Sequence, residues 1–203
     1  MYVIGKPVIQ FVTSSIQLFL LADVPTFDAQ KVEDFTAVKD EEVQTKVNEN
    51  NELPSSELDY PVGGQQYGRI LVSKIGLDVP LYFGDTEELL RLGAGQFMGS
   101  VYPGEQGTSL IGGHNVDGFG KLAMINIGDE IQIQTTYGNY VFTVSNKEVA
   151  NKDDEAINDR IYQRDNRTAL LYTCYPIDSL GMTDERLFIT ADYTSGPIIN
   201  ENE

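Results

Sequence analysis

Short apolar segments recur along the chain after Tyr67, separated by Gly-rich or Asn-rich turns, and residues 130–134 and 140–144 alternate between apolar and polar. Alternation of this kind is typical of β-strands with one face in a core. The pattern predicts strands at residues 68–72, 79–82, 108–111, 130–134, 140–144, 169–173 and 187–193. Residues 137–139, Tyr-Gly-Asn, join two of these strands as a hairpin.

Helical signals are short. Thr86 is a good N-cap, and Glu87 and Glu88 follow it in the first turn, so we expect a helix at residues 86–91. Residues 120–127 indicate one more helical turn. Many short strands with few helices predict an all-β fold, a closed or nearly closed β-barrel.

The N-terminal part of the chain has a different composition. Residues 7–24 are apolar but contain Gln and Ser, whereas residues 28–59 are acidic and polar, as in a linker or a solvated helix. The apolar stretch could be the outer end of a membrane anchor, a helix on a membrane surface, or a helix packed on the domain. We therefore divide the chain into an N-terminal juxtamembrane or linker extension, residues 1–60, and a barrel domain, residues 61–203. Most of the extension, to about Glu52, is expected to be dispensable for barrel folding.

Charge and composition limit the classes of binding partner and substrate that the protein could have. The 203 residues carry a formal charge of −17, with 31 acidic and 14 basic side chains, and no basic stripe is present. Nucleic acid and anionic phosphate substrates are therefore poor candidates, whereas a peptide or an amine is compatible. One cysteine excludes an intramolecular disulfide, and one histidine means that no second imidazole could replace it.

Three chemically active side chains lie at the ends of predicted strands. Cys174 follows the strand at 169–173, His114 follows the strand at 108–111 through two glycines, and Arg186 precedes the strand at 187–193. If these ends meet, a cation beside the thiol would favour the nucleophilic thiolate. The imidazole could then act as acid and base, and the guanidinium could stabilise an oxyanion.

Each of these residues also has a structural interpretation. Cys174 could be a buried apolar side chain, His114 a surface residue, and Arg186 the partner of Asp184 or Glu185 in an ion pair. Spacing alone leaves both interpretations open.

The sequence around these residues resembles the sortases. Leu171-Tyr172-Thr173-Cys174 is similar to the TLxTC signature, Gly113-His114 to the catalytic Gly-His element, and Arg186 stands where sortases place an essential arginine. Residues 67–84, 93–115 and 119–133 resemble the opening strands, the segment before the histidine and the helix that follows it. The resemblance covers residues 67–193.

Cys174-Tyr175-Pro176 followed by Arg186 is most similar to class D sortases. No Asp-Pro-aromatic lid of the class C type precedes the barrel. Residues 147–168 are too short for the long helix of class B and are expected to form the loop that sets specificity. Leu170, Ile177 and Asn115 depart from the usual residues, which puts substrate preference in doubt and leaves the three active residues intact.

The resemblance implies an eight-stranded sortase-type barrel and a cysteine transpeptidase. Such an enzyme would cut an LPxTG-like sorting signal between Thr and Gly through a thioester on Cys174, and then join the Thr carbonyl to an amine. The amine would belong to a peptidoglycan precursor or another acceptor. It implies His114 and Arg186 as the other catalytic residues, with Thr173, Asn115 and Tyr175 as substrate contacts.

The resemblance further implies a protein anchored near its N-terminus, on the extracellular face of the cell membrane of a Gram-positive bacterium. No cofactor is required. Acidic residues are too dispersed to assign a calcium or other metal site.

Other functions remain open. A hydrolytic cysteine peptidase would use the same residues, and products with and without an amine would distinguish it. A non-catalytic β-barrel surface module predicts a buried Cys174 that does not react with iodoacetamide. An L,D-transpeptidase agrees less well with the sequence, because the SHGC-type signature of those enzymes is missing.

Overall fold

A computed structural model describes residues 35–44, 46–116, 118–177 and 183–202. The apolar stretch at residues 7–24 lies outside these ranges, so the alternatives for it stay open. In the described residues, no helix has both the length and the apolar character needed to cross a bilayer.

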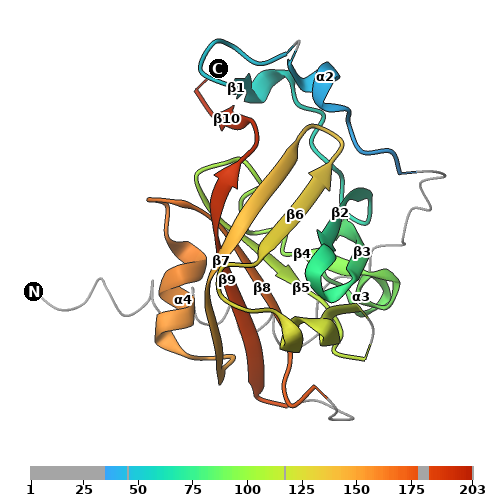
Figure 1. Ribbon diagram of the computed structural model, residues 1–203, viewed down its shortest axis with the longest axis vertical. Helices are drawn as coiled ribbons and strands as arrows, with labels where there is room; N and C mark the ends of the chain where they lie inside the picture. Colours follow the sequence, from blue (N-terminus) through green and yellow to red (C-terminus); the bar gives the residue numbers. More distant parts are fainter. Residues whose placement is uncertain (1–34, 45, 117, 178–182, 203) are drawn as a thin grey trace, which may run out of the picture.

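The barrel consists of eight strands, and Figure 1 shows it with its ends toward the top and the bottom of the view. The order around the barrel is β2-β3-β4-β5-β8-β9-β7-β6, and β6 closes the barrel against β2. The pairs β3–β4 and β5–β8 are parallel and the other neighbours are antiparallel. Their bounds are β2 (Gln66–Val72), β3 (Leu77–Phe83), β4 (Ala94–Gln96), β5 (Gly107–Gly112), β6 (Glu130–Thr135), β7 (Asn139–Asn151), β8 (Arg167–Cys174) and β9 (Glu185–Ser195). The predicted all-β barrel is confirmed.

Short helices precede the barrel or connect its strands. They are α2 (Asp40–Gln44), η1 (Ser55–Glu57), η2 (Ser73–Ile75), α3 (Glu87–Leu92), η3 (Gly118–Met124) and α4 (Glu155–Tyr162). Thr86 caps α3 as predicted, since its hydroxyl accepts a hydrogen bond from the Leu89 N–H at 3.4 Å.

The expectation that residues 147–168 form a loop is wrong in part. β7 continues to Asn151 and α4 follows, with Asp154 capping the helix by accepting a hydrogen bond from the Ala156 N–H at 2.8 Å. The sequence pattern was hard to recognise because α4 buries only Ile157 and Ile161 among polar neighbours.

A second, small sheet joins the two ends of the described chain. β1 (Glu52–Pro54) pairs in parallel with β10 (Ile198–Asn200). Figure 1 shows this pair together with α2 beyond the upper end of the barrel. Leu53 and Ile199 in this sheet are 1% and 2% exposed. Residues inside the predicted extension therefore pack against the C-terminal strand.

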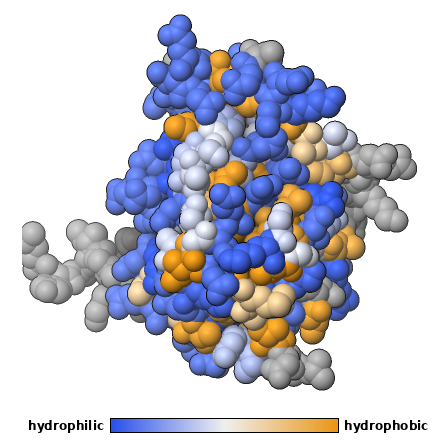
Figure 2. Space-filling view, in the orientation of Figure 1, coloured by the Kyte–Doolittle hydropathy of each residue, from blue (hydrophilic) through white to orange (hydrophobic). Residues whose placement is uncertain are grey.

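Two apolar clusters hold the barrel together. The larger fills the interior and includes Ile70, Ile111, Leu171 and Ile189. The smaller lies between the outer face of the sheet and α4, and it is made of Leu110, Ile157, Ile161, Leu170, Tyr172 and Phe188. The remaining surface is mostly hydrophilic on the face in Figure 2, with apolar residues gathered in its lower half. The negative charge is thus carried largely by solvated side chains.

Candidate active site

The ends of β5, β8 and β9 bring the three predicted residues together. In the antiparallel pair β8–β9, Cys174 lies directly opposite Arg186, where Cα atoms are about 4.5–5.5 Å apart. The parallel pair β5–β8 ends with Gly112 opposite Tyr172, and the Gly113 N–H then donates to the Tyr172 carbonyl at 3.2 Å. His114 is the next residue, just beyond the paired part of β5. The predicted meeting of three strand ends is thus present in the backbone register.

Strand alternation fixes the face on which Cys174 and Arg186 lie. Leu171, Leu187 and Ile189 point into the barrel, whereas Tyr172 and Phe188 belong to the outer cluster beneath α4. Side chains two residues apart share a face. Cys174 and Arg186 therefore lie on the outer face, beside the aromatic side chains of Tyr172 and Phe188.

Arg186 is held by the backbone and is 7% exposed. Its guanidinium donates to the carbonyls of Thr183 and Glu185, the latter at 2.9 Å. Asp184 pairs with Lys152 at 3.3 Å, and no ion pair of Arg186 occurs within the described part of the chain. The structure therefore does not support the interpretation of Arg186 as the partner of Asp184 or Glu185 in a surface ion pair.

The thiol of Cys174 is free and the residue is half-buried, as is His114. A thiol that is partly accessible and next to a guanidinium can be reached by a substrate. Cys174 is therefore not the fully buried cysteine that a non-catalytic module predicts.

The predicted substrate contacts occupy three different environments. Thr173 is 1% exposed, and its hydroxyl donates to the Gly113 carbonyl at 2.8 Å, so it joins the end of β8 to the residue before His114. The Asn115 amide donates to the Ile177 carbonyl at 2.8 Å. The Tyr175 N–H donates to the Glu185 carbonyl at 3.1 Å. These contacts fix the segments around the three active residues, and contact with substrate stays a prediction.

A row of small and aromatic residues crosses the outer face next to Cys174, and sequence analysis did not identify it. The row runs Gly95, Gly112, Tyr172, Phe188 through cross-strand pairs of β4, β5, β8 and β9. A Cβ at Gly112 would lie 2.6 Å from the Tyr172 hydroxyl oxygen, so the aromatic ring covers that glycine. At both glycines neighbouring atoms occupy the place of a side chain, the Tyr172 ring over Gly112 and the Gly84 carbonyl and Asp85 over Gly95. Two glycines at paired strand positions are the signal that could have located this close packing.

Asp85 is a buried acid near this row and was also missed. It is 7% exposed, and a Cβ at Gly95 would lie 2.9 Å from its Cα. Burial raises the pKa of Asp85 to about 7, opposed by a hydrogen bond from its own backbone N–H. Burial also raises the pKa of Tyr172 well above its usual range, and Asp85 adds to that rise while Arg186 opposes it. Tyr172 therefore lies within electrostatic reach of both residues.

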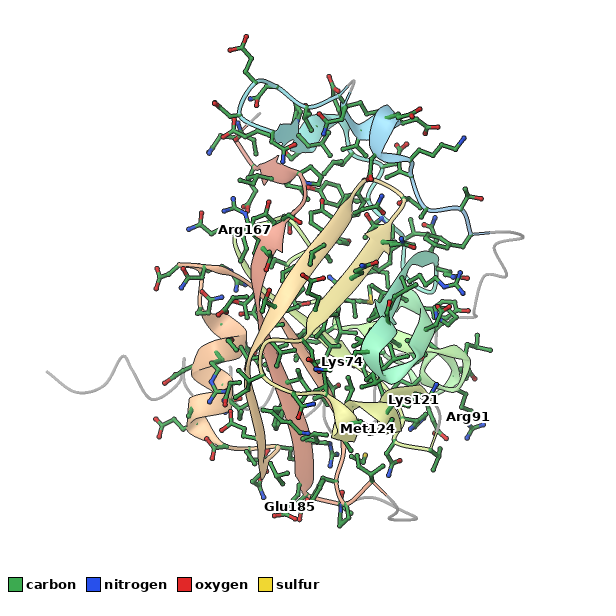
Figure 3. The ribbon with its side chains drawn as sticks, in the orientation of Figure 1. Lys74, Arg91, Lys121, Met124, Arg167 and Glu185 are labelled. Atoms are coloured by element: carbon green, nitrogen blue, oxygen red, sulfur yellow. The ribbon has the colours of Figure 1, made fainter. Side chains whose placement is uncertain are left out.

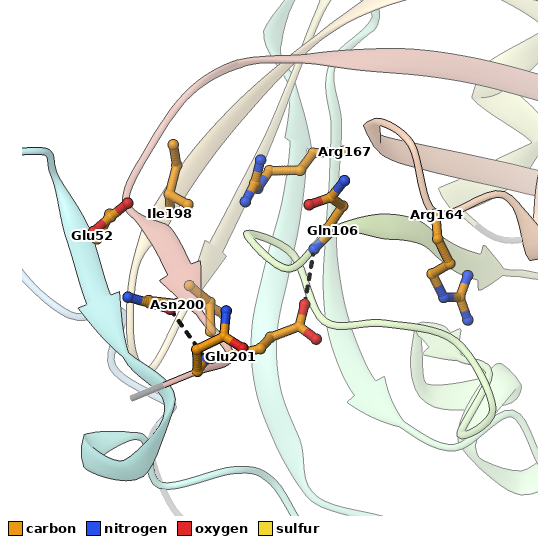
Figure 4. Close-up of a pocket in the computed structure, with 9 residues that line it drawn as sticks. Glu52, Gln106, Arg164, Arg167, Ile198, Asn200 and Glu201 are labelled. Atoms are coloured by element: carbon orange, nitrogen blue, oxygen red, sulfur yellow. Dashed lines mark hydrogen bonds between the residues drawn. The ribbon is translucent and has the colours of Figure 1, made fainter.

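A cavity of about 500 Å³ lies away from this site, at the start of β8. Figure 4 shows its lining, in which Arg164 and Arg167 are balanced by Glu52 and Glu201. Arg167 and Cys174 stand at the two ends of β8, seven residues apart, which is about 23 Å at 3.3 Å per residue. Figure 3 accordingly shows Arg167 and Glu185 toward opposite ends of the barrel. This cavity has no part in the chemistry of Cys174.

Across the described ranges, no group of three or more His, Cys, Asp or Glu side chains is arranged to hold a metal ion.

Comparison with known proteins agrees with the geometry of the strand ends. Residues 70–194 match the family described as the sortase domain, which is more than half of the chain. The chain belongs to the sortase family, whose members are transpeptidases of bacterial cell surfaces.

Individual relatives narrow the comparison. Sortase D of Bacillus subtilis (strain 168) is 26% identical over 173 residues, which cover 84% of this chain and 86% of the relative. The Sortase D5 transpeptidase of Clostridium perfringens has a TM-score of 0.59 at 23% identity and covers 76% of this chain and 95% of its own. The expected similarity to class D is confirmed.

A third structure is sortase C of Clostridium perfringens with its C-terminal cell wall sorting motif. It has a TM-score of 0.59 at 25% identity, covering 78% of this chain and 92% of that one. Similar folds thus occur among sortases of more than one class.

Proposed function

We propose that this sortase cleaves an LPxTG-like sorting signal between Thr and Gly and transfers the Thr carbonyl to an amine. Cys174 would attack the carbonyl and form a thioester. The observation that supports this most directly is the register that sets Cys174 opposite Arg186, with His114 and Cys174 each two residues beyond the Gly112–Tyr172 pair.

His114 and Arg186 have complementary roles in this proposal. The imidazole protonates the leaving amine and later takes a proton from the incoming amine. The guanidinium donates to the oxyanion that forms during attack, and it can do so without losing its proton. Its contacts with the carbonyls of Thr183 and Glu185 hold it in place beforehand, which reduces reorganisation in the transition state.

Three neighbouring residues support the site. Thr173 would position the histidine through the Gly113 carbonyl, in addition to the substrate contact expected of it. Asn115 and Tyr175 would contact substrate from the segments on either side of Cys174. Substrate would approach the outer face of the sheet beside Tyr172, because Cys174 lies on that face.

The biological setting is part of the same proposal. The acceptor amine belongs to a peptidoglycan precursor or a similar cell-wall component. The enzyme acts on the extracellular face of the cell membrane of a Gram-positive bacterium, anchored near its N-terminus.

The test is incubation of the protein with LPxTG-like peptides and an amine, followed by mass spectrometry. We expect a covalent peptide adduct on Cys174 and a peptide–amine product, both lost in Cys174→Ala. Cleavage to the free acid alone, even with saturating amine, would identify a hydrolytic peptidase. Adduct on the Cys174→Ala variant would refute the assignment of the nucleophile.

A further inference from the structure

A small cavity of about 90 Å³ has His114 in its lining. The last turn of α3 contributes Arg91 and Leu92 to it, and the segment after β5 contributes His114. Val79 and Phe119 supply apolar walls. Cys174 does not line this cavity, so it is distinct from the surface over which the cleaved peptide would lie.

Glycines shape the walls. A Cβ at Gly118 would lie 2.2 Å from a methyl group of Val79, and a Cβ at Gly113 would lie 2.5 Å from the Phe119 ring. Side chains at these two positions would displace both walls. Since a water molecule occupies about 30 Å³ of liquid, the cavity has room for a few non-hydrogen atoms, such as one amino-acid terminus.

Arg91 gives the cavity a cation that is readily available. Its guanidinium pairs with Glu87 one turn earlier on α3, and the two side chains are 68% and 61% exposed. An exposed pair of this kind contributes about 0–1 kcal/mol, so another carboxylate can replace Glu87 at low cost. Figure 3 shows Arg91 at the periphery of the molecule, where a ligand from solvent can reach it. A guanidinium binds a carboxylate through two parallel hydrogen bonds.

We propose that this cavity binds the acceptor, and that the acceptor carries a carboxylate close to its amine, as an α-amino acid does. Arg91 binds the carboxylate and the amine faces His114. The proposal rests on the function proposed above.

In the transfer step the neutral amine nitrogen bonds to the thioester carbonyl carbon. The carbon–sulfur bond breaks, its electron pair returns to the Cys174 sulfur, and the proton lost by nitrogen passes to His114. Arg91 does not touch the reacting atoms, so it is a specificity residue that acts on the binding of the acceptor.

Glycine and glycinamide form a suitable pair of probes, because they differ in the carboxylate. Each variant is compared with the wild type using the same acceptor, so the different basicities of the two amines cancel. Arg91→Gln should raise the KM for glycine about tenfold and leave the KM for glycinamide within about twofold, the loss expected for one charge-assisted hydrogen bond. Glu87→Gln should lower the KM for glycine, since it removes the competing carboxylate.

Arg69→Gln is the matched control. Arg69 pairs with Asp78 as an exposed guanidinium–carboxylate pair, and it does not line the cavity. Its substitution should change neither KM. Equal effects of Arg91→Gln on both acceptors, or none on either, would overturn the proposal even where the peptide adduct on Cys174 forms normally.

A binding measurement separates this proposal from the proposed function. His114 is the single histidine of the chain, so its imidazole gives one set of NMR signals. In the Cys174→Ala variant, glycine should shift these signals, glycinamide should shift them much less, and Arg91→Gln should abolish the response to glycine. Absence of any difference between the two ligands rejects the carboxylate site, whatever the outcome for catalysis.

Discussion

Arg186 is the residue whose environment says most about its chemistry. It is buried, lies opposite Cys174 and, among the residues that the structure describes, is bonded to backbone carbonyls and to no carboxylate. A guanidinium without a neutralising carboxylate retains its full charge for a developing oxyanion.

Replacement of Arg186 should therefore reduce turnover more than binding. We expect Arg186→Ala to lower kcat by about 10²–10³, as for the loss of one oxyanion donor. Arg186→Lys should rescue only in part, because lysine lacks the planar fork. Steady-state kinetics with circular dichroism as a folding control measure both effects. A lysine variant with near-normal kcat would show that positive charge alone is sufficient.

Asp85 predicts a pH-dependent contribution to stability. Its pKa rises from 3.8 to about 7 on burial, so the folded protein binds a proton that the unfolded chain releases. Stability should then fall as the pH rises from about 4 to 7, by at most a few kcal/mol. Asp85→Asn keeps an oxygen for the backbone N–H and cannot ionise.

The variant should be more stable than wild type at pH 8 and similar near pH 4, measured by urea unfolding at both values. An Asp85→Asn protein that loses stability equally at both pH values would argue for a paired carboxylate at this position.

At the scale of elements, α4 supports the outer surface next to Cys174. Ile157 is 1% exposed and packs in the cluster that contains Tyr172 and Phe188. Ile157→Ala should cost about 2–5 kcal/mol of stability, and the less constrained aromatic rings should raise the KM for the sorting peptide more than they lower kcat.

Asp159→Ala, on the exposed face of α4, is the control and should change neither stability nor KM. A fall in kcat at constant KM for Ile157→Ala would mean that α4 acts on the reacting groups themselves.

Most strands were predictable because each is a short alternating or continuously apolar segment bounded by turn residues, and the long hairpin of β6 and β7 was found from the turn at 137–139. β4 was not predicted, because the three residues Ala-Gly-Gln show no hydrophobic pattern and form a strand only by pairing with β3 and β5. The positions of Cys174, His114 and Arg186 at strand ends were visible in the sequence. What joins them, the parallel register of β5 and β8, depends on segments about 60 residues apart, and local pattern does not encode it.

At the scale of the whole molecule, the β1–β10 sheet gives part of the predicted extension a structural role. Residues at and just before α2 also reach the barrel, since the Val38 N–H donates to the Thr135 carbonyl at 3.1 Å and Val43 is 4% exposed. We therefore expect different parts of residues 1–60 to contribute differently to the stability of the barrel domain.

Removal of residues 1–34 should leave the melting temperature unchanged, whereas removal of residues 1–54 also removes β1 and exposes Ile199. Losing the buried side chain of Leu53 should lower the free energy of unfolding by about 1.5–3 kcal/mol, and the Tm of a domain of this size by about 3–12 °C. Differential scanning calorimetry of the two truncations distinguishes them. Equal melting temperatures would show that the barrel does not depend on β1.

The same pair of strands has a consequence for synthesis of the protein. The Asn51 amide donates to the Gly196 carbonyl at 2.7 Å, across 145 residues of chain. A ribosome that adds about 5–20 residues per second needs about 7–30 s between these two positions. Throughout that interval β1 has no partner, so a nascent chain that stops before β10 cannot complete this sheet. The small sheet is thus completed only when translation has reached the C-terminal strand.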